Sequence, residues 1–322
     1  MLHTAATRRG RALPAAVLSA VLLVTGTLAG CSSDEGASAP TSPSASADDG
    51  STSPSPSPTV GTGRFPTYVA LGDSYTAAPG VPTQDPDDGC QRSSNNYPHL
   101  VASHFTGSAL TDVSCSGADS TSLVGVQRTP DGVLHPAQFD ALSNDVDLVT
   151  IGMGGNDLNL FGTLIGGCIA AARTDTEGTP CTDLGEKKLQ KTIAGIRERL
   201  TAAFLGVKDR APKAEVVAVG YPQIVPATGT CLTLLPIAAG DYPFARRVNQ
   251  QLDDAVRAAA AKAKVGFADV WAATAGHDIC ADDPWINGAQ QRPNDAIPFH
   301  PFAAEQKAAA QAVIAAIGSA KG

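Results

Sequence analysis

The chain has 322 residues, a formal net charge of −8 at pH 7 and 43% hydrophobic residues. Lysine and arginine form nothing beyond short pairs such as Lys187-Lys188 and Arg246-Arg247, so no basic groove for nucleic acid is expected. The length allows one sizeable folded domain after an unusual N-terminal region.

Residues 1–30 have the order of a secretory signal: a basic start, an apolar stretch from Ala12 to Leu23, and then small residues. The apolar stretch is too short for a stable membrane span. The segment ends in Leu28-Ala29-Gly30-Cys31, which resembles the lipobox of bacterial lipoproteins, where cleavage leaves an acylated cysteine. We therefore expect a lipoprotein signal peptide over 1–30 and a lipid on Cys31, with ordinary secretion as the alternative.

Residues 31–63 are almost entirely Ser, Pro, Thr, Ala, Gly and Asp. Such a segment cannot bury enough apolar surface to offset the entropy of ordering, so it is predicted to be a disordered tether. The folded part is then 64–322. We expect this domain to be exported and either lipid-anchored to the outer face of the cell membrane or secreted, with the lipid as its one membrane contact.

Short apolar runs alternate with longer helical patterns in the folded part. The predicted strands are Thr67–Leu71, Ala109–Val113, Val146–Met153, Glu215–Gly220 and Val265–Val270. Helices are predicted over Glu186–Val207, around Val248–Val256, and from near Pro301 to Ile317. This alternation indicates a parallel sheet covered on both faces. The expected fold is α/β, a flavodoxin-like three-layer αβα sandwich with a central, mainly parallel five-stranded sheet.

The chain has seven cysteines. With Cys31 assigned to the lipid, an even number remains, which indicates disulfides in an exported protein. The sequence permits many pairings, and pairing of neighbours is preferred because each pair then falls inside one strand–helix segment. No CxxC or HExxH spacing is present, so we expect no metal and no other cofactor.

Ligands of open parallel sheets bind beyond the carboxyl ends of the strands. Motifs with a nucleophile, a base or hydrogen-bond donors follow the first three predicted strands or precede the final helix. They are Gly72-Asp73-Ser74, Cys115-Ser116-Gly117, Gly154-Gly155-Asn156-Asp157 and, before the final helix, Phe299-His300-Pro301. Acyl transfer needs a hydroxyl nucleophile, an imidazole base and N–H donors for the developing oxyanion. The four motifs together supply this set.

Gly72-Asp73-Ser74-Tyr75, Gly117, Gly155-Asn156-Asp157 and His300-Pro301 resemble, in order and spacing, the four blocks of the SGNH (GDSL) hydrolase family. The resemblance is strongest to its secreted actinobacterial esterases, lipases and phospholipases. It implies that Ser74 is the nucleophile, that His300 is the base, and that the oxyanion hole comprises Ser74, Gly117 and Asn156. It also implies the disulfides Cys90–Cys115, Cys168–Cys181 and Cys231–Cys280.

One position departs from the family pattern. The family usually has an aspartate three residues before the histidine to orient the imidazole, and Ile297 stands there. We expect a Ser–His dyad in which the main-chain carbonyl of Ile297 or Pro298 orients His300. The alternative is that Asp295 provides the orienting carboxylate.

Other polar residues near these motifs are interpreted as structural. Asp73 and Asp157 are predicted to bond nearby backbone in tight turns. Surface or capping roles are predicted for the remaining histidines of the folded part: His99, His104, His135 and His277.

Two segments are unusually apolar and are predicted to be loops beside the site, at the carboxyl ends of the strands: Leu158–Ala172 and Cys231–Ala239. They are interpreted either as a satellite core or as walls of an acyl groove beside Ser74. We expect a monomeric serine ester hydrolase of the carboxylesterase or lipase type that acts on small-molecule or lipid esters through an acyl-enzyme. The alternatives are a carbohydrate acetyl esterase and a catalytically silent envelope lipoprotein that binds ligands.

Overall fold

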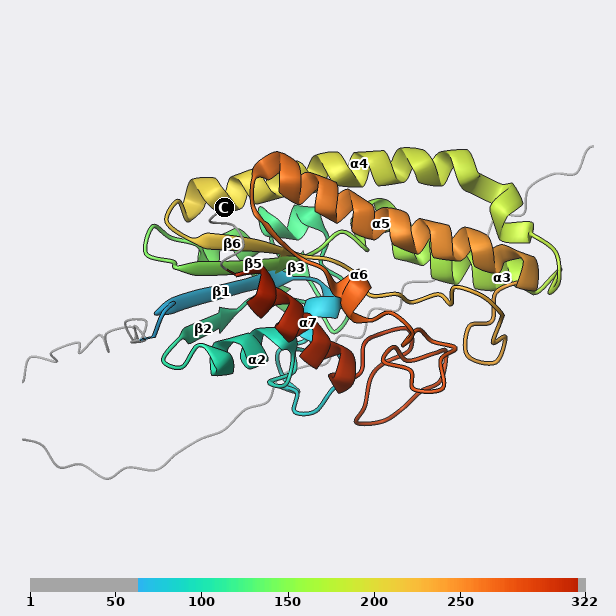
Figure 1. The fold of residues 1–322 in the computed structure, drawn as a ribbon, viewed down its shortest axis with the longest axis horizontal. Coiled ribbons are helices and arrows are strands. Elements are labelled where there is room, and N and C mark those ends of the chain that lie inside the picture. The colour runs from blue at the N-terminus through green and yellow to red at the C-terminus, as the bar shows by residue number, and fades with distance from the viewer. Residues whose placement is uncertain (1–62, 318–322) are drawn as a thin grey trace, which may run out of the picture. The chain divides into compact units, whose positions relative to one another are not determined.

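Five parallel strands form the central sheet, in the order β2-β1-β5-β6-β7 (Figure 1). The strands are β1 (Thr67–Gly72), β2 (Ala109–Asp112), β5 (Leu148–Gly152), β6 (Glu215–Val219) and β7 (Gly266–Ala268). The three central strands are buried along almost their whole length, as expected when both faces of a sheet are covered. This order is that of a flavodoxin-like doubly wound sheet, which confirms the predicted fold class.

The computed structural model describes residues 63–317. The predicted signal peptide over 1–30, the predicted lipidation at Cys31 and nearly all of the predicted tether lie outside the described residues. Within 63–317, no helix combines the length and the apolar character that are needed to cross a membrane.

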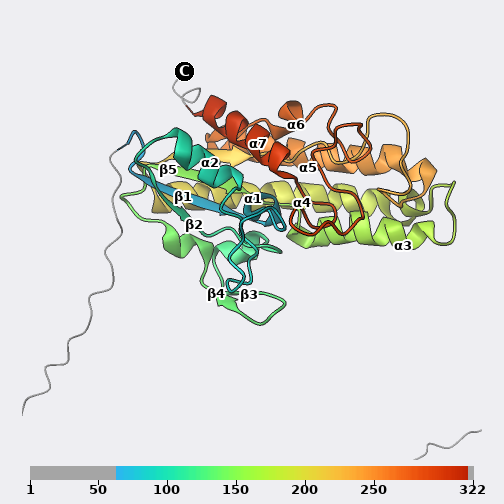
Figure 2. The ribbon, with the colours of Figure 1, turned by 90° about the horizontal axis from the view of Figure 1, so that it is seen from below.

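Helices cover both faces of the sheet. The helices α4 (Pro180–Arg210) and α5 (Tyr242–Ala263) pack side by side over one face. The helices α2 (Tyr97–His104) and α7 (Ala303–Ala316) pack together over the other face (Figures 1 and 2). The result is three layers, helix on sheet on helix.

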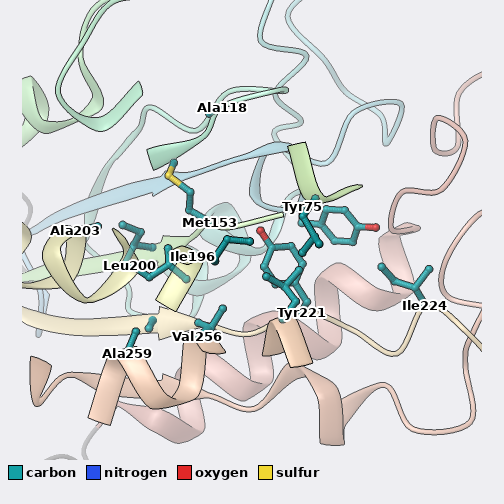
Figure 3. Close-up of a cluster of buried hydrophobic side chains, with 14 of the residues drawn as sticks. Tyr75, Ala118, Met153, Ile196, Leu200, Ala203, Tyr221, Ile224, Val256 and Ala259 are labelled. Carbon is teal, nitrogen blue, oxygen red and sulfur yellow. The ribbon is translucent and has the colours of Figure 1, made fainter. Parts of the chain in front are cut away.

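The two cores are built from alternate residues of the strands, because successive side chains of a strand point to opposite faces. In β1, Val69 and Leu71 pack in the cluster beneath α4 and α5, whereas Tyr68 and Ala70 pack in the cluster beneath α2 and α7. Figure 3 shows part of the first cluster: Met153 just beyond β5, Ile196, Leu200 and Ala203 from α4, and Val256 and Ala259 from α5. This packing covers both faces of the sheet and fixes the strands that carry the loops of the site.

Two predicted elements differ from the structure. The last helix begins at Ala303, and Pro301 lies before it in an isolated β-bridge with Ile286, so the proline does not occupy the first helical turn. The segment predicted as a loop over 158–172 is largely helical, with a π-helix (Gly162–Gly167) followed by α3 (Cys168–Ala172). Its buried residues Leu160, Leu164 and Cys168 recur every four positions, which is a helical spacing.

Several short elements were not predicted. A hairpin of β3 (Gln127–Arg128) and β4 (Leu134–His135) projects from the sheet (Figure 2). The short helix α6 (Val270–Ala273) follows β7. The short helix α1 (Ser74–Ala77) follows β1 and does begin at Ser74, as the family resemblance implies. Three disulfides join the pairs that the family resemblance implies: Cys90–Cys115, Cys168–Cys181 and Cys231–Cys280.

Candidate active site

Ser74 stands directly beyond β1, at the first position of α1, with its side chain buried. Asp73 caps this helix, because its carboxylate accepts a hydrogen bond from Tyr75 N at 2.8 Å. A Cβ on Gly72 would lie 2.7 Å from the carbonyl oxygen of Gly152, so only glycine allows so close an approach to β5. The chain therefore turns sharply here and presents the Ser74 hydroxyl at the carboxyl end of β1.

His300 faces Ser74. His300 Nε2 lies 2.8 Å from Ser74 Oγ, and His300 Nδ1 lies 2.8 Å from the carbonyl oxygen of Pro298. Because a carbonyl can only accept, Nδ1 carries the proton and Nε2 can accept the serine proton. Asp295 instead pairs with Arg292, whose Nη1 is 3.7 Å from the carboxylate. Of the predicted orienting groups, the carbonyl of Pro298 is the one that contacts the imidazole.

The segment that carries His300 is held from several sides. Tyr75 Oη donates to the carbonyl of Phe299 at 2.8 Å, and Asn287 N donates to the carbonyl of His300 at 2.9 Å. Asn287 Nδ2 also donates to the carbonyl of Ala296 at 2.8 Å. Phe299 has a φ of 64°, a left-handed conformation that is uncommon outside glycine and needs such support.

Gly117 and Asn156 follow β2 and β5, the two neighbours of β1 in the sheet. Gly117 has a φ of 78°, which favours glycine, and its turn is tied to β1 by a 3.0 Å hydrogen bond from Cys115 N to the carbonyl of Gly72. Asn156 Nδ2 donates one of its two hydrogens to the carbonyl of Ala118 at 2.9 Å. This bond fixes the plane of the amide and so sets the direction of its second N–H. The topology thus brings both predicted oxyanion-hole residues to the edge that carries Ser74.

The chain matches the model of the GDSL-like Lipase/Acylhydrolase family over residues 70–308. It belongs to this family. It is 38% identical over 262 residues to Lipase 2 of Streptomyces coelicolor, covering 78% of this chain and 85% of that protein. It is 33% identical over 233 residues to a lipase of Streptomyces rimosus, covering 68% of this chain and 75% of that one.

Among solved structures, the fold is similar to phospholipase A1 from Streptomyces albidoflavus NA297, with a TM-score of 0.64 and 26% identity. That match covers 78% of this chain and 98% of the phospholipase. Family and relatives together make the chain a carboxylic ester hydrolase of the lipase/esterase kind.

Burial favours the neutral form of the His300 imidazole in this GDSL-like hydrolase. Desolvation lowers the pKa of His300 to about 4, and the hydrogen bond to the Pro298 carbonyl opposes that shift. A base must be unprotonated before the reaction begins. The environment therefore keeps His300 in the form that can take a proton.

Tyr221 joins the Ser74 turn to the Asn156 turn, and the sequence reasoning missed it. Its hydroxyl donates to Asp73 and accepts from Gly155 N, the latter at 2.7 Å, and the ring is buried. Burial raises the pKa of Asp73 to about 7, and the Tyr221 hydrogen bond opposes the shift. Tyr221 lies just beyond β6, so the rule about strand ends, applied once more, could have found it.

Asp157 has a comparable environment. It accepts hydrogen bonds from the backbone N and the hydroxyl of Ser120, and its carboxylate lies 3.4 Å from Arg199 Nη1. Burial raises its pKa. Asp73 and Asp157 thus tie the turns of the site together.

The other predicted histidines lie elsewhere. His99 Nδ1 contacts Asn96 Oδ1 at 2.7 Å, and His277 stacks on Trp285. His135 lies beside the Cys90–Cys115 disulfide, with ligand atoms of all three residues within 4.8 Å of one another. Both sulfurs are bonded to each other, so they offer no thiolate to a metal ion.

The two apolar segments do meet. Phe161 and Leu164 from the first and Leu235 and Ile237 from the second line a void of about 10 Å³, which leaves room for about one water molecule. Three of these side chains are buried in the main core, so the segments pack chiefly as core. Nearer the surface, Ile169, Leu232 and Pro236 help to line an open apolar pocket of about 320 Å³.

Phe161 connects this apolar region to the dyad. Its ring centroid lies 5.4 Å from that of Tyr75, which in turn lies 5.4 Å from the imidazole of His300. Leu158, two residues beyond Asn156, is exposed to solvent. Aliphatic and aromatic side chains therefore flank the Ser74–His300 pair on the side of Phe161.

Proposed function

We propose that this hydrolase cleaves acyl or lipid esters through an acyl-enzyme, with Ser74 as the nucleophile and His300 as the base. The observation that carries the proposal is the 2.8 Å contact between Ser74 Oγ and His300 Nε2, continued by the 2.8 Å contact from Nδ1 to Pro298. A serine hydroxyl is a weak nucleophile, and a base within hydrogen-bond reach, itself oriented by a third group, is the arrangement that activates it.

In the first half-reaction, Ser74 Oγ attacks the ester carbon and its proton passes to His300 Nε2. The carbonyl electrons move onto the oxygen, which is bound by the N–H groups of Ser74 and Gly117 and by the amide of Asn156. One such donor contributes on the order of 3 kcal/mol to the transition state. Collapse of the intermediate breaks the bond to the alcohol, which leaves with the proton from His300.

In the second half-reaction, water attacks the acyl-enzyme while His300 Nε2 takes its proton. The acid departs and Ser74 recovers its hydrogen. Throughout, the Pro298 carbonyl holds the tautomer and the orientation of the ring, although its dipole stabilises the imidazolium less than a carboxylate would.

The choice of acyl or lipid esters as substrates is supported by the apolar side chains beside Ser74 and His300 and by relatives named as lipases. A series of p-nitrophenyl esters, from acetate to decanoate, tests this choice. Rates that peak at medium chains support it. A peak at acetate with collapse beyond butyrate would instead favour an acetyl esterase.

We also propose that residues 1–30 direct export and that Cys31 anchors the domain over 64–322 through the tether, at the outer face of the membrane, as a monomer. The three disulfides suit an oxidising compartment, and an extracellular lipase of S. rimosus has a similar structure, with a TM-score of 0.64 and 25% identity. Mass spectrometry of the membrane fraction tests this: an N-terminal acylated peptide that starts at Cys31 is expected, and a Cys31→Ser variant should appear in the medium.

A further inference from the structure

The proposed oxyanion hole takes its donors from three separate turns, which follow β1, β2 and β5. An oxyanion accepts all of these hydrogen bonds only when each donor lies within about 3 Å of the position that the oxygen takes. The relative positions of the three turns therefore govern how well the transition state is bound.

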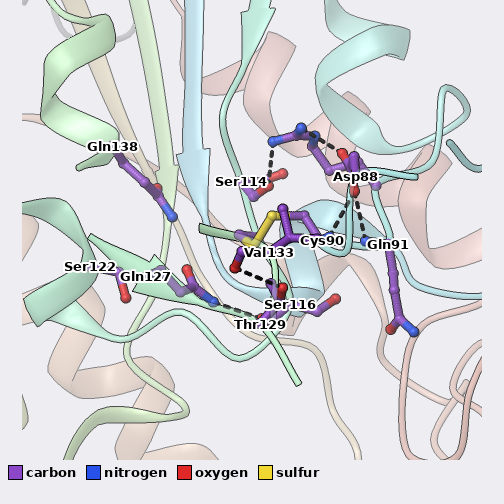
Figure 4. The surroundings of a disulfide bond; sticks show 12 residues. Asp88, Cys90, Gln91, Ser114, Ser116, Ser122, Gln127, Thr129, Val133 and Gln138 are labelled. Atoms are coloured by element: carbon purple, nitrogen blue, oxygen red, sulfur yellow. Dashed lines mark hydrogen bonds and ion pairs between the residues drawn. A yellow bond between two sulfur atoms is a disulfide. The ribbon is translucent and has the colours of Figure 1, made fainter. Parts of the chain in front are cut away.

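The Gly117 turn is held by covalent and hydrogen bonds. The Cys90–Cys115 disulfide joins it to the segment between α1 and α2, and Gln127 Nε2 donates to the carbonyl of Ser116 at 2.9 Å (Figure 4). Gly117 thus lies two residues from a cross-link, which restricts its movement relative to the sheet.

The hydroxyl of Tyr221 joins the other two turns. It contacts Asp73, the residue before Ser74. It also contacts Gly155, the residue before Asn156. Gly155 N can only donate, and it lies 2.7 Å away, so the hydroxyl accepts there and gives its single proton to Asp73 Oδ2. The bridge therefore runs in one direction, from Gly155 through Tyr221 to Asp73.

Asp73 transmits this contact to the backbone of the nucleophile. While its Oδ2 accepts from Tyr221, its Oδ1 accepts from Tyr75 N at 2.8 Å and caps α1. Ser74 is the first residue of α1, so the direction of its N–H depends on this cap.

Tyr221 is itself held on several sides. Its backbone N donates to Asp253 Oδ1 on α5 at 3.1 Å. Its buried ring meets the rings of Tyr75 and Phe161 edge-on, with centroids 5.3 and 5.5 Å away, and Figure 3 shows it beside Tyr75. A hydroxyl on a ring packed in this way keeps its place, and so do the turns that it binds.

We propose that Tyr221 is a positioning residue of the oxyanion hole, which holds the N–H of Ser74 and the amide of Asn156 at the spacing that the oxyanion requires. The inference rests on the proposed ester hydrolysis at Ser74. Tyr221 acts through Asp73 and Gly155 and not by contact with the substrate. Its hydroxyl therefore contributes to the transition state, in which the oxygen carries charge, and not to the binding of the neutral ester.

Tyr221→Phe tests this role, because it removes the hydroxyl and keeps the ring. On p-nitrophenyl octanoate we expect kcat to fall about thirtyfold with KM changed less than about twofold, since a displaced oxyanion donor acts on the transition state alone. Thermal unfolding checks that the variant is folded at the assay temperature.

Tyr68→Phe is the matched control. The Tyr68 hydroxyl is also buried and contacts Thr150 Oγ1 at 2.8 Å, but it packs in the cluster beneath α2 and α7. This variant loses a comparable hydrogen bond and should keep the wild-type kcat.

Asp73→Asn breaks the same bridge from its other end and leaves the tyrosine in place. An asparagine can still accept from Tyr75 N, but its NH₂ group cannot accept the Tyr221 proton. We expect kcat to fall about tenfold with KM nearly unchanged.

A double-mutant cycle separates positioning from a general loss of structure. Asn156→Ala removes the amide that Tyr221 is proposed to position. In that background Tyr221→Phe should lower kcat about fivefold or less, because the N–H of Ser74 alone remains to be displaced. A purely structural role would give the same factor in both backgrounds.

The outcomes distinguish this inference from the proposed function. A kcat within about twofold of the wild type in both Tyr221→Phe and Asp73→Asn, or equal factors in the two backgrounds, would overturn the positioning role and leave ester hydrolysis at Ser74 intact. A wild type that cleaved no ester, or a Ser74→Ala variant that kept the wild-type rate, would overturn the proposed function together with this inference.

Discussion

The surroundings of His300 and the surroundings of Gly117 differ in how their polar groups are hydrogen-bonded. Around His300, hydrogen bonds from Tyr75 and Asn287 hold the backbone, and the Pro298 carbonyl holds the ring. Beside Gly117, Ser116 Oγ and Gln127 Oε1 are buried without partners. A scaffold that must keep one geometry uses its hydrogen bonds internally, whereas an unpaired buried oxygen costs about 1–3 kcal/mol of stability, so the region around His300 is the better satisfied of the two.

The largest effect should come from removing the proposed base. His300→Ala should lower kcat by about 10⁴ or more, the scale seen when a member of such a catalytic set is lost. Asp295→Asn should change kcat less than about twofold, because that carboxylate pairs with Arg292 instead. Steady-state kinetics on p-nitrophenyl octanoate measures both. A loss near 10⁴ in Asp295→Asn would show that a carboxylate, and not Pro298, orients the ring.

A smaller effect should follow when the support of the His300 segment is weakened. Tyr75→Phe removes the 2.8 Å hydrogen bond to the Phe299 carbonyl, so kcat should fall about tenfold with KM nearly unchanged. Tyr242→Phe is the matched control, because its buried hydroxyl donates to the Leu235 carbonyl at 2.7 Å, away from the dyad. If both variants kept the wild-type kcat, the hydroxyl of Tyr75 would have no positioning role.

The pH profile tests the electrostatic side of the same scaffold. Because burial lowers the pKa of His300 to about 4, the base stays neutral well below pH 6. We expect kcat/KM to be level from about pH 8 to about pH 5.5 and to fall as the pH approaches 4. A midpoint near 6.5, the ordinary value for histidine, would contradict this reading of the site.

The smallest expected effect concerns stability. Glu305 is buried on α7 next to Tyr75, accepts a hydrogen bond from Gln306 Nε2 at 2.8 Å, and burial raises its pKa to about 8. Between about pH 4.5 and 8 the folded state keeps a proton that the unfolded state has lost, so the free energy of unfolding falls as the pH rises through this window.

Glu305→Gln removes this dependence. Its Tm should be close to that of the wild type at pH 5 and exceed it by roughly 10 °C at pH 9, measured by thermal unfolding. Equal differences at both pH values would mean that the effect is packing and not ionisation.

The sequence predicted the sheet, and it singled out Ser74 and His300, whose side chains the structure brings to 2.8 Å, because apolar strand runs and the motifs after them are local signals. It predicted neither the contact of Tyr221 with Gly155 nor that of Gln127 with Ser116, since each joins separate turns of the chain. The orienting group was left open at Ile297, Pro298 and Asp295. A main-chain carbonyl carries no sequence signature, and its direction depends on the left-handed conformation of Phe299.

The helical nature of 158–172 was missed for a related reason. The glycines at 162, 166 and 167 have low helix propensity, yet the buried spacing of Leu160, Leu164 and Cys168 and the disulfide to Cys181 are consistent with a helix there. Tertiary contacts outweighed local propensity at this segment.

Covalent labelling of the intact protein tests the central claim most directly. A fluorophosphonate should react at neutral pH with Ser74 alone, as shown by peptide mass spectrometry, and the label should be lost in Ser74→Ala and strongly slowed in His300→Ala. No labelling at neutral pH, or equal labelling of Ser74→Ala, would contradict the Ser74–His300 dyad.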